Sequence, residues 1–241
     1  MCWSPAVTVT MVGAGAVATG VSLARRQPAA FSATLGYFTL MEGLQAVGYA
    51  VIDQCGQPVN QVVTLLSFLH IVFQPFFINA FAMELVAVPV RPRVRWAAFG
   101  ACAVSSAVML LQLYPFEWAG MWRPGAILCG KVLCTVTGDW HQAWDIPFNG
   151  MLNAFDNAMR QMIGLSRSFP TYLVVAFIVP LFYGAWRFVI FHALVGPILA
   201  GSLTSNPNEI PAIWCLFSIG LTVIAMSPPI RRRFGPAPAM A

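Results

Sequence analysis

Long apolar stretches recur along this sequence, and the segments between and after them hold all of its arginines. As helices, stretches of this length cross a hydrocarbon core of about 30 Å. Seven are found, at residues 6–23, 31–52, 62–86, 96–114, 169–185, 188–204 and 210–227. The chain is 59% hydrophobic and 9% charged, against about 25% charged in an ordinary soluble domain. The sequence therefore predicts an all-α fold, a polytopic membrane bundle of seven transmembrane helices forming one domain, residues 1–241.

The long apolar run at residues 169–204 is divided into two of these helices because of its length. As a single helix it would measure about 54 Å, which exceeds the thickness of the hydrocarbon core. Gly184, Trp186 and Arg187 interrupt the run. We therefore expect a break at residues 185–187.

The basic residues predict the orientation of the bundle. With the N-terminus outside, nine of them fall on the inner side: Arg25, Arg26, Arg91, Arg93, Arg95, Arg187, Arg231, Arg232 and Arg233. Four remain outside, at Arg123, Lys131, Arg160 and Arg167. This excess follows the positive-inside rule and predicts a cytoplasmic C-terminus in the cell (inner) membrane. The net charge of +5 is then an orientation signal, since no basic cluster of the kind that binds nucleic acid is present.

The outer loop, residues 115–168, is the one long connection. Its tryptophans, Trp118, Trp122, Trp140 and Trp144, suit an interfacial aromatic belt. Residues 151–163 place apolar side chains on one side and polar ones on the other. The apolar side holds Met151, Leu152, Phe155, Met159, Met162 and Ile163, and the polar side holds Asp156, Asn157, Arg160 and Gln161. This pattern predicts one amphipathic helix lying in the membrane interface.

The cysteines favour disulfides on the outer side. Cys2, Cys55, Cys129 and Cys134 are exterior in this topology, while Cys102 and Cys215 lie in spans. An even exterior set suits an oxidising compartment, with three pairings open. The alternative is a zinc or copper site, because Cys129, Cys134, Asp139, His141 and Asp145 fall within 17 residues. Their spacing matches no standard zinc module, so we expect disulfides in preference to a metal.

The third stretch carries a polar stripe. Ser67, His70 and Gln74 stand at i, i+3 and i+7, on one face of a helix. Pro75 follows directly and leaves the carbonyl of Ile71 without its helical partner. Such groups are costly in lipid unless neighbouring helices or water satisfy them. Other helices are therefore expected to face this stripe.

Glu42 and His70 are the candidate catalytic residues. Both lie near the middle of their spans, and the short loop at residues 53–61 favours antiparallel packing that brings them into contact. One interpretation is a hydrogen bond that joins two helices. The other is a site that binds a transition metal, relays a proton or activates water. Gln45, Ser67, Gln74, Asn79 and His192 are candidates for a substrate or ion pathway, and His192 is also a possible second metal ligand beside His70.

Several functions are excluded. A retinal pigment needs a lysine within a span, and the only lysine is Lys131 in the outer loop. The phosphate-binding motif G-x-x-x-x-G-K-[ST] and the hydrolase motif G-x-S-x-G are absent, so neither retinal nor a nucleotide is expected. Three hypotheses remain. The protein is an enzyme acting on a lipid-soluble substrate, a transporter or channel, or an accessory or sensor subunit that docks another membrane protein through its outer loop. Membrane lipids are the other expected partners.

Several segments resemble an uncharacterised bacterial multi-pass membrane family, a domain of unknown function. They are the opening Met1-Cys2-Trp3-Ser4 and residues 40–62, 70–79, 114–120 and 206–220. This resemblance implies a fold and no activity. A weaker one is to the seven-span hydrolases that include alkaline ceramidases and adiponectin-type receptors, where a serine and a histidine stand on the third span. It implies a metal held by His70, although Ser67 and His70 are three residues apart instead of four, and no histidine follows His192.

Overall fold

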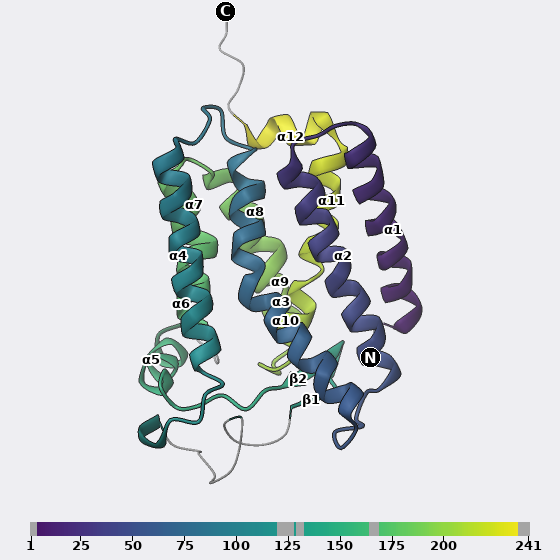
Figure 1. Cartoon of the computed structure of the whole chain (residues 1–241), viewed down its shortest axis with the longest axis vertical. Coiled ribbons are helices and arrows are strands. Elements are labelled where there is room, and N and C mark those ends of the chain that lie inside the picture. The colour runs from purple at the N-terminus through teal and green to yellow at the C-terminus, as the bar shows by residue number, and fades with distance from the viewer. Residues whose placement is uncertain (1–3, 120–127, 129–132, 164–168, 236–241) are drawn as a thin grey trace, which may run out of the picture.

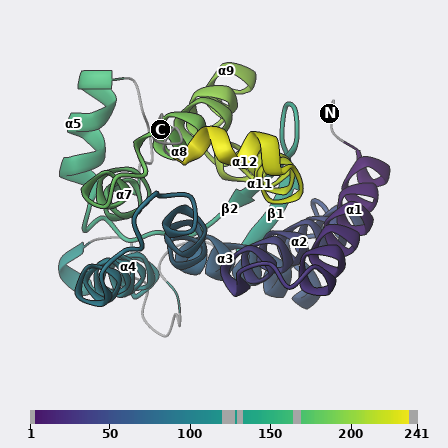
Figure 2. The same cartoon turned by 90° about the horizontal axis from the view of Figure 1, so that it is seen from above.

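The computed structural model describes residues 4–119, 128, 133–163 and 169–235, and these are helical apart from one two-stranded hairpin. Helices α1 to α4 stand side by side in one row, and the later helices cover one face of it (Figure 2). The row consists of α1 (Pro5–Ala24), α2 (Ala29–Ala50), α3 (Pro58–Met83) and α4 (Pro92–Leu111). Each begins at or just after a proline, which lacks the backbone N–H that a helix start would leave unpaired.

The second layer contains two helical segments with internal π turns. The first is α6 (Pro170–Leu173), η2 (Val174–Ile178) and α7 (Val179–Phe182), and the second is α8 (Trp186–Ala193), η3 (Leu194–Ile198) and α9 (Leu199–Leu203). The π turns lie at prolines, Pro180 just after η2 and Pro197 within η3. Because proline lacks a backbone N–H, the usual i→i−4 hydrogen bond is lost there and the helix widens locally into a π turn. A break is present as predicted, but it lies at residues 183–185, where Gly184 has a φ of 90°, and Trp186 and Arg187 begin α8 instead of lying in the break.

The chain ends in α10 (Ile210–Trp214), α11 (Phe217–Met226) and α12 (Pro228–Phe234). α12 turns by 105° from the preceding helices and lies across one end of the bundle, while the β-hairpin lies at the opposite end (Figure 1). We call these the α12 end and the hairpin end. α1 starts at the hairpin end, so the chain begins and finishes at opposite ends.

Four helical segments are long and apolar enough to cross a membrane. They are Pro5–Ala24, Pro58–Met83, Pro92–Leu111 and Trp186–Leu203. The bent pair Ile210–Met226 and Pro228–Phe234 qualifies when its two parts are taken together, and Pro170–Phe182 is apolar but shorter. Exposed valine, leucine, isoleucine and phenylalanine side chains occur on every long helix. Such a surface is consistent with lipid as the solvent.

The outer loop contains structure that the sequence analysis did not predict. β1 (Cys134–Thr137) pairs antiparallel with β2 (Gln142–Asp145). The predicted amphipathic helix is present as α5 (Asn153–Ile163), and its Phe155 and Met162 are 41% and 77% exposed. A short 3₁₀ turn, η1 (Glu117–Ala119), follows α4. The tryptophan belt is only partly present, because Trp144 is buried whereas Trp118 is exposed, and Trp122 lies outside the described residues.

Candidate functional site

The polar stripe of α3 is buried, and α2 provides its closest partner. His70 Nε2 lies 2.7 Å from the carbonyl oxygen of Tyr37, while the Tyr37 hydroxyl donates to the carbonyl of His70. The two rings stack with centroids 3.9 Å apart. Hydroxyl groups of Thr34 and Ser106 donate to the carbonyls of Phe77 and Val72, on either side of Pro75. Neighbouring helices therefore satisfy only part of the stripe: His70 Nε2 and Gln74 Oε1 have partners, whereas the Ser67 hydroxyl has none among the described residues.

Gln74 and Asn79 join α3 to the second layer. Gln74 accepts a hydrogen bond from the Tyr172 hydroxyl. Asn79 Nδ2 donates to the carbonyls of Pro75 and Val175, and Asn79 Oδ1 accepts from Tyr183. Because these amides are paired with protein groups, they stabilise helix packing.

Two other predicted pathway residues have different surroundings. Gln45 Nε2 donates to the carbonyl of Ala212, 3.3 Å away, and so joins α2 to α10. Ser67 is buried, and its hydroxyl has no hydrogen-bond partner among the described residues.

Among the described residues Glu42 is not hydrogen-bonded to His70, in contrast to one interpretation of the sequence. Its Oε1 accepts a hydrogen bond from Ser218 Oγ at 3.2 Å, and its Oε2 has no partner among the described residues although the side chain is only 3% exposed. His70 bonds to Tyr37 through Nε2, and its Nδ1 is unpaired. Tyr37 and Glu42 are five residues apart, so they face about 140° apart around α2. The two candidate catalytic residues therefore lie in separate environments.

A small cavity adjoins Glu42. Residues of α1, α2 and α11 line it, among them Gly15, Thr39, Ser218 and Thr222. Its volume of about 10 Å³ is room for about one water molecule. Gly15 faces Thr39 so closely that a Cβ at residue 15 would collide with the Thr39 hydroxyl. The carboxyl group thus lies behind α1, beside hydroxyl groups.

His192 is enclosed by aromatic rings. It is fully buried and stacks on Phe217 and Phe177, with centroids 4.1 and 4.5 Å away. Trp214 Nε1 donates to His192 Nε2 at 3.1 Å. His192 Nε2 is thus engaged within an aromatic core, while its Nδ1 has no hydrogen-bond partner among the described residues.

The hairpin is fixed to the loop between α2 and α3. A disulfide joins Cys55 to Cys134, as one of the pairings open from the sequence. Asp53 accepts hydrogen bonds from the backbone N–H and hydroxyl of Thr137. Cys2 and Cys129 lie outside the described residues, and Cys102 and Cys215 are free and buried.

Asn60, which the sequence analysis did not single out, forms hydrogen bonds to the backbone of β1 as a neighbouring strand would. Its Oδ1 accepts from the Thr135 N–H, and its Nδ2 donates to the carbonyls of Thr135 and Val51. Thr64 adds a hydroxyl contact to Thr135 at 2.7 Å. The first turn of α3 thereby extends the edge of β1.

Glu209 is the second residue that the sequence analysis missed. This buried carboxylate precedes α10 and accepts from the backbone N–H groups of Asp139, Trp140 and His141 and from the Thr204 hydroxyl. Gly138 is required beside it, because a Cβ there would overlap the carboxylate. Glu209 therefore holds the hairpin turn against the start of α10. The available signal was one acidic residue between the polar turn at residues 204–208 and the apolar run that follows it.

The predicted outer metal site lacks a free thiolate among the described residues. Cys134 is in the disulfide, and His141 Nδ1 pairs with the Tyr49 hydroxyl and the Gln142 N–H. Burial lowers the pKa of His141 to about 3, so its ring is neutral at pH 7. Over the described ranges, no three His, Cys, Asp or Glu side chains gather closely enough to hold a metal ion.

Comparison with known proteins gives a family and no activity. No curated protein and no solved structure matches the chain, and the seven-span hydrolases are therefore not among its matches. The model of one family, described as a family of unknown function (DUF5765), matches residues 6–235. That stretch runs from the first turn of α1 to the end of α12. The chain therefore belongs to this family of unknown function, DUF5765.

Proposed function

We propose that this protein is a seven-span integral membrane protein of the cell (inner) membrane, and that it works through reversible protonation of Glu42. The observation that carries this proposal is the Oε2 of a buried carboxyl group, which has no partner among the described residues and lies beside a small cavity that Thr39, Ser218 and Thr222 help to line. Ionisable groups inside a membrane are costly and are retained for function by default. Proton-coupled transport or sensing fits this site better than catalysis, because Glu42 and His70 are not joined.

The contrast with Glu209 supports a special role for Glu42. Both side chains are buried, but Glu209 receives hydrogen bonds from four donors, whereas Glu42 receives one. A carboxylate with many donors is stable as an anion and serves structure. A carboxyl group with a single hydroxyl partner in lipid is stable only with a proton bound. Glu42 is thus suited to bind and release a proton.

α1 is the element that senses the charge on Glu42. It lies at the edge of the row formed by α1 to α4. Only 17% of its apolar 18-residue stretch is buried, and it packs closely against α2 at Gly15. When Glu42 releases its proton to water in the cavity, the resulting carboxylate needs further hydration. α1 then moves away from α2 and α11 to admit water, which couples protonation to helix position.

Infrared difference spectroscopy of the protein in liposomes tests this proposal. Between pH 5 and pH 9, the wild type is expected to lose the C=O stretching band of a protonated carboxyl group, and Glu42→Gln should lack that band. Glutamine keeps the shape and the Ser218 contact, so its stability should stay within about 1 kcal/mol of wild type. Hydrogen exchange of α1, corrected for intrinsic rates, should rise with pH in wild type and not in Glu42→Gln.

Two controls make the assignment specific. Ser218→Ala should shift the frequency of the band without removing it, since this hydroxyl bonds to Glu42 Oε1. Glu117→Gln, at an exposed position, should leave the band unchanged. An identical band in Glu42→Gln, or α1 exchange that ignores pH, would show that Glu42 is only a packing residue.

The membrane topology has its own test. A reporter fused after residue 241 should be cytoplasmic, and one fused at the N-terminus should be outside, because the arginines concentrate at the α12 end. Both reporters on one side of the membrane would contradict seven spans.

A further inference from the structure

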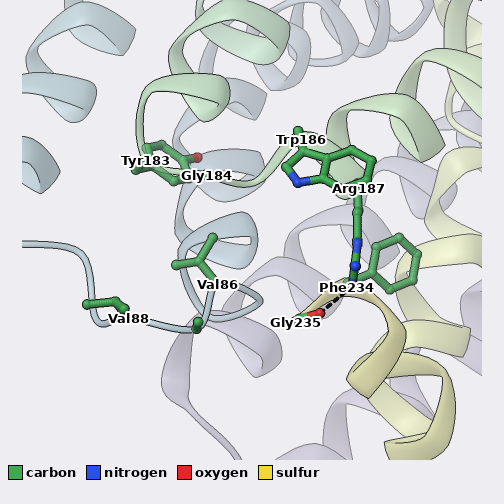
Figure 3. Close-up of a pocket in the computed structure, with 9 residues that line it drawn as sticks. Val86, Val88, Tyr183, Gly184, Trp186, Arg187, Phe234 and Gly235 are labelled. Atoms are coloured by element: carbon green, nitrogen blue, oxygen red, sulfur yellow. Dashed lines mark hydrogen bonds between the residues drawn. The ribbon is translucent and has the colours of Figure 1, made fainter. Parts of the chain in front are cut away.

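A cavity of about 390 Å³ opens at the α12 end of the bundle (Figure 3). Three segments form it: the connection from α3 to α4, the break between α7 and α8, and the end of α12. Its walls include Val86, Val88, Tyr183, Trp186, Arg187 and Phe234. The cavity is thus mostly apolar and aromatic, with one guanidinium group, and no carboxylate lines it.

Arg187 brings unused hydrogen-bond donors to this cavity. Its Nη1 donates to the carbonyls of Arg233 and Gly235, and Figure 3 shows the side chain reaching toward Gly235. Those two bonds use two of the five N–H groups of a guanidinium. Within the described ranges, the three on Nε and Nη2 have no protein acceptor, and no acidic side chain pairs with Arg187. A half-buried cation with free donors and no counter-charge favours an anionic ligand.

The surroundings of Arg187 favour a ligand with an apolar tail. Trp186, 52% exposed, packs under the guanidinium with its ring centroid 5.2 Å away. Val88, which lines the cavity, is 75% exposed, and Phe182, the residue before the lining Tyr183, is 83% exposed, so apolar side chains beside the cavity face outward. Arg187 also lies in the first turn of a segment long enough to span a membrane, at the depth where lipid head groups lie. An isolated anion would gain nothing from these apolar side chains.

We propose that this cavity binds an anionic phospholipid. Arg187 holds the phosphate through Nε and Nη2, and one acyl chain lies along Phe182 and Val88. The triplet Arg231, Arg232 and Arg233 on α12 raises the local concentration of anionic lipid. This inference does not involve Glu42, and it shares with the proposed function only the premise that α8 lies in a bilayer.

Binding of short-chain lipids to the full chain in neutral detergent tests the site. Native mass spectrometry should show dioctanoyl phosphatidylglycerol bound about tenfold more tightly than dioctanoyl phosphatidylcholine. Arg187→Gln should weaken phosphatidylglycerol binding about tenfold, because the charge-assisted hydrogen bonds are lost. Arg25→Gln, which removes an exposed arginine at the same end on α1, should bind as wild type does.

A second variant separates lipid binding from the stability of α12. Ala87→Phe fills the cavity while leaving Arg187 and its two carbonyl contacts intact, and it should also weaken binding about tenfold. Equal affinity for the two lipids overturns the proposal, because no anionic head group is then recognised. Equal loss in Arg25→Gln and Arg187→Gln overturns it in favour of a general surface charge. Inorganic phosphate that displaces the lipid at millimolar concentration would identify a free-anion site instead.

Discussion

Replacing Glu209 by alanine is expected to lower the free energy of unfolding by about 3–5 kcal/mol, since a buried hydrogen-bonded charge is removed from four donors. Three of these are backbone N–H groups of the hairpin turn, at Asp139, Trp140 and His141, and the fourth is the Thr204 hydroxyl. In the variant they stay away from bulk water without an acceptor. For a chain of this size the midpoint of thermal unfolding should fall by about 10 °C. Thermal unfolding in detergent measures this shift.

Glu209→Gln and Glu84→Ala are the matched comparisons. Glutamine keeps one acceptor oxygen but turns an NH₂ group toward backbone donors, so it should lose about half as much stability as alanine. Glu84 is exposed at the end of α3, and its replacement should change stability by no more than about 0.5 kcal/mol. Hydrogen exchange should accelerate first at residues 139–141 in the Glu209 variants. If hydrogen exchange at residues 139–141 is as slow in Glu209→Ala as in the wild type, these N–H groups do not depend on the carboxylate.

Loss of the disulfide is expected to lower the free energy of unfolding by about 2–5 kcal/mol, because the bond reduces the conformational entropy of the unfolded chain. Cys55 and Cys134 are 79 residues apart, so the bond restricts a long loop in the unfolded chain. Reductant should lower the unfolding midpoint of the wild type, and Cys55→Ser should show the lowered midpoint with or without reductant. Mass mapping without reductant should find Cys55 and Cys134 linked. Free alkylation of both thiols in the untreated protein would contradict the bond.

The two losses should not add. The disulfide and Glu209 hold the same hairpin from two sides, through β1 and through the turn at residues 138–141. Once one connection is lost, the hairpin separates more readily from the helices. The other connection then contributes less to the free energy of unfolding. The double variant Cys55→Ser/Glu209→Ala should therefore lose less than the sum of the single variants. Strict additivity would mean that the hairpin is not one cooperative unit.

Helix positions were predictable from the sequence because lipid imposes a simple length rule. Each apolar stretch corresponds to a helical segment, and the excess length of residues 169–204 predicted a break at residues 185–187, close to the observed one around Gly184. The hairpin was missed because its strands have four residues each and lie in a segment without long-range periodicity. The β-branched run Thr135, Val136 and Thr137 before Gly138 was a local signal for it.

The burial of Glu42 and His70 was predictable from the sequence, but the neighbours that they meet were not. Counting residues along each span predicted that both lie near its middle, and both are buried inside the protein. Their contact also depended on how each helix is rotated about its axis, which a short connecting loop does not determine. Tyr37 occupies the face of α2 that meets His70, and Glu42 turns to Ser218 on α11. Rotation is decided by packing among helices distant in sequence, such as the Phe38 contacts with His70 and Phe217.

The hairpin makes the two ends of this bundle mechanically unequal. At the hairpin end, covalent and hydrogen-bonded links join the α2–α3 loop, both strands and the start of α10. At the α12 end, Arg187 reaches the carbonyls of α12, and Gln27 and Arg231 reach the carbonyl of Ala225. Tilting of one helix against another must therefore pivot near the hairpin. Displacement grows with distance from a pivot, so any movement of these helices is largest at the end of the bundle where α12 lies.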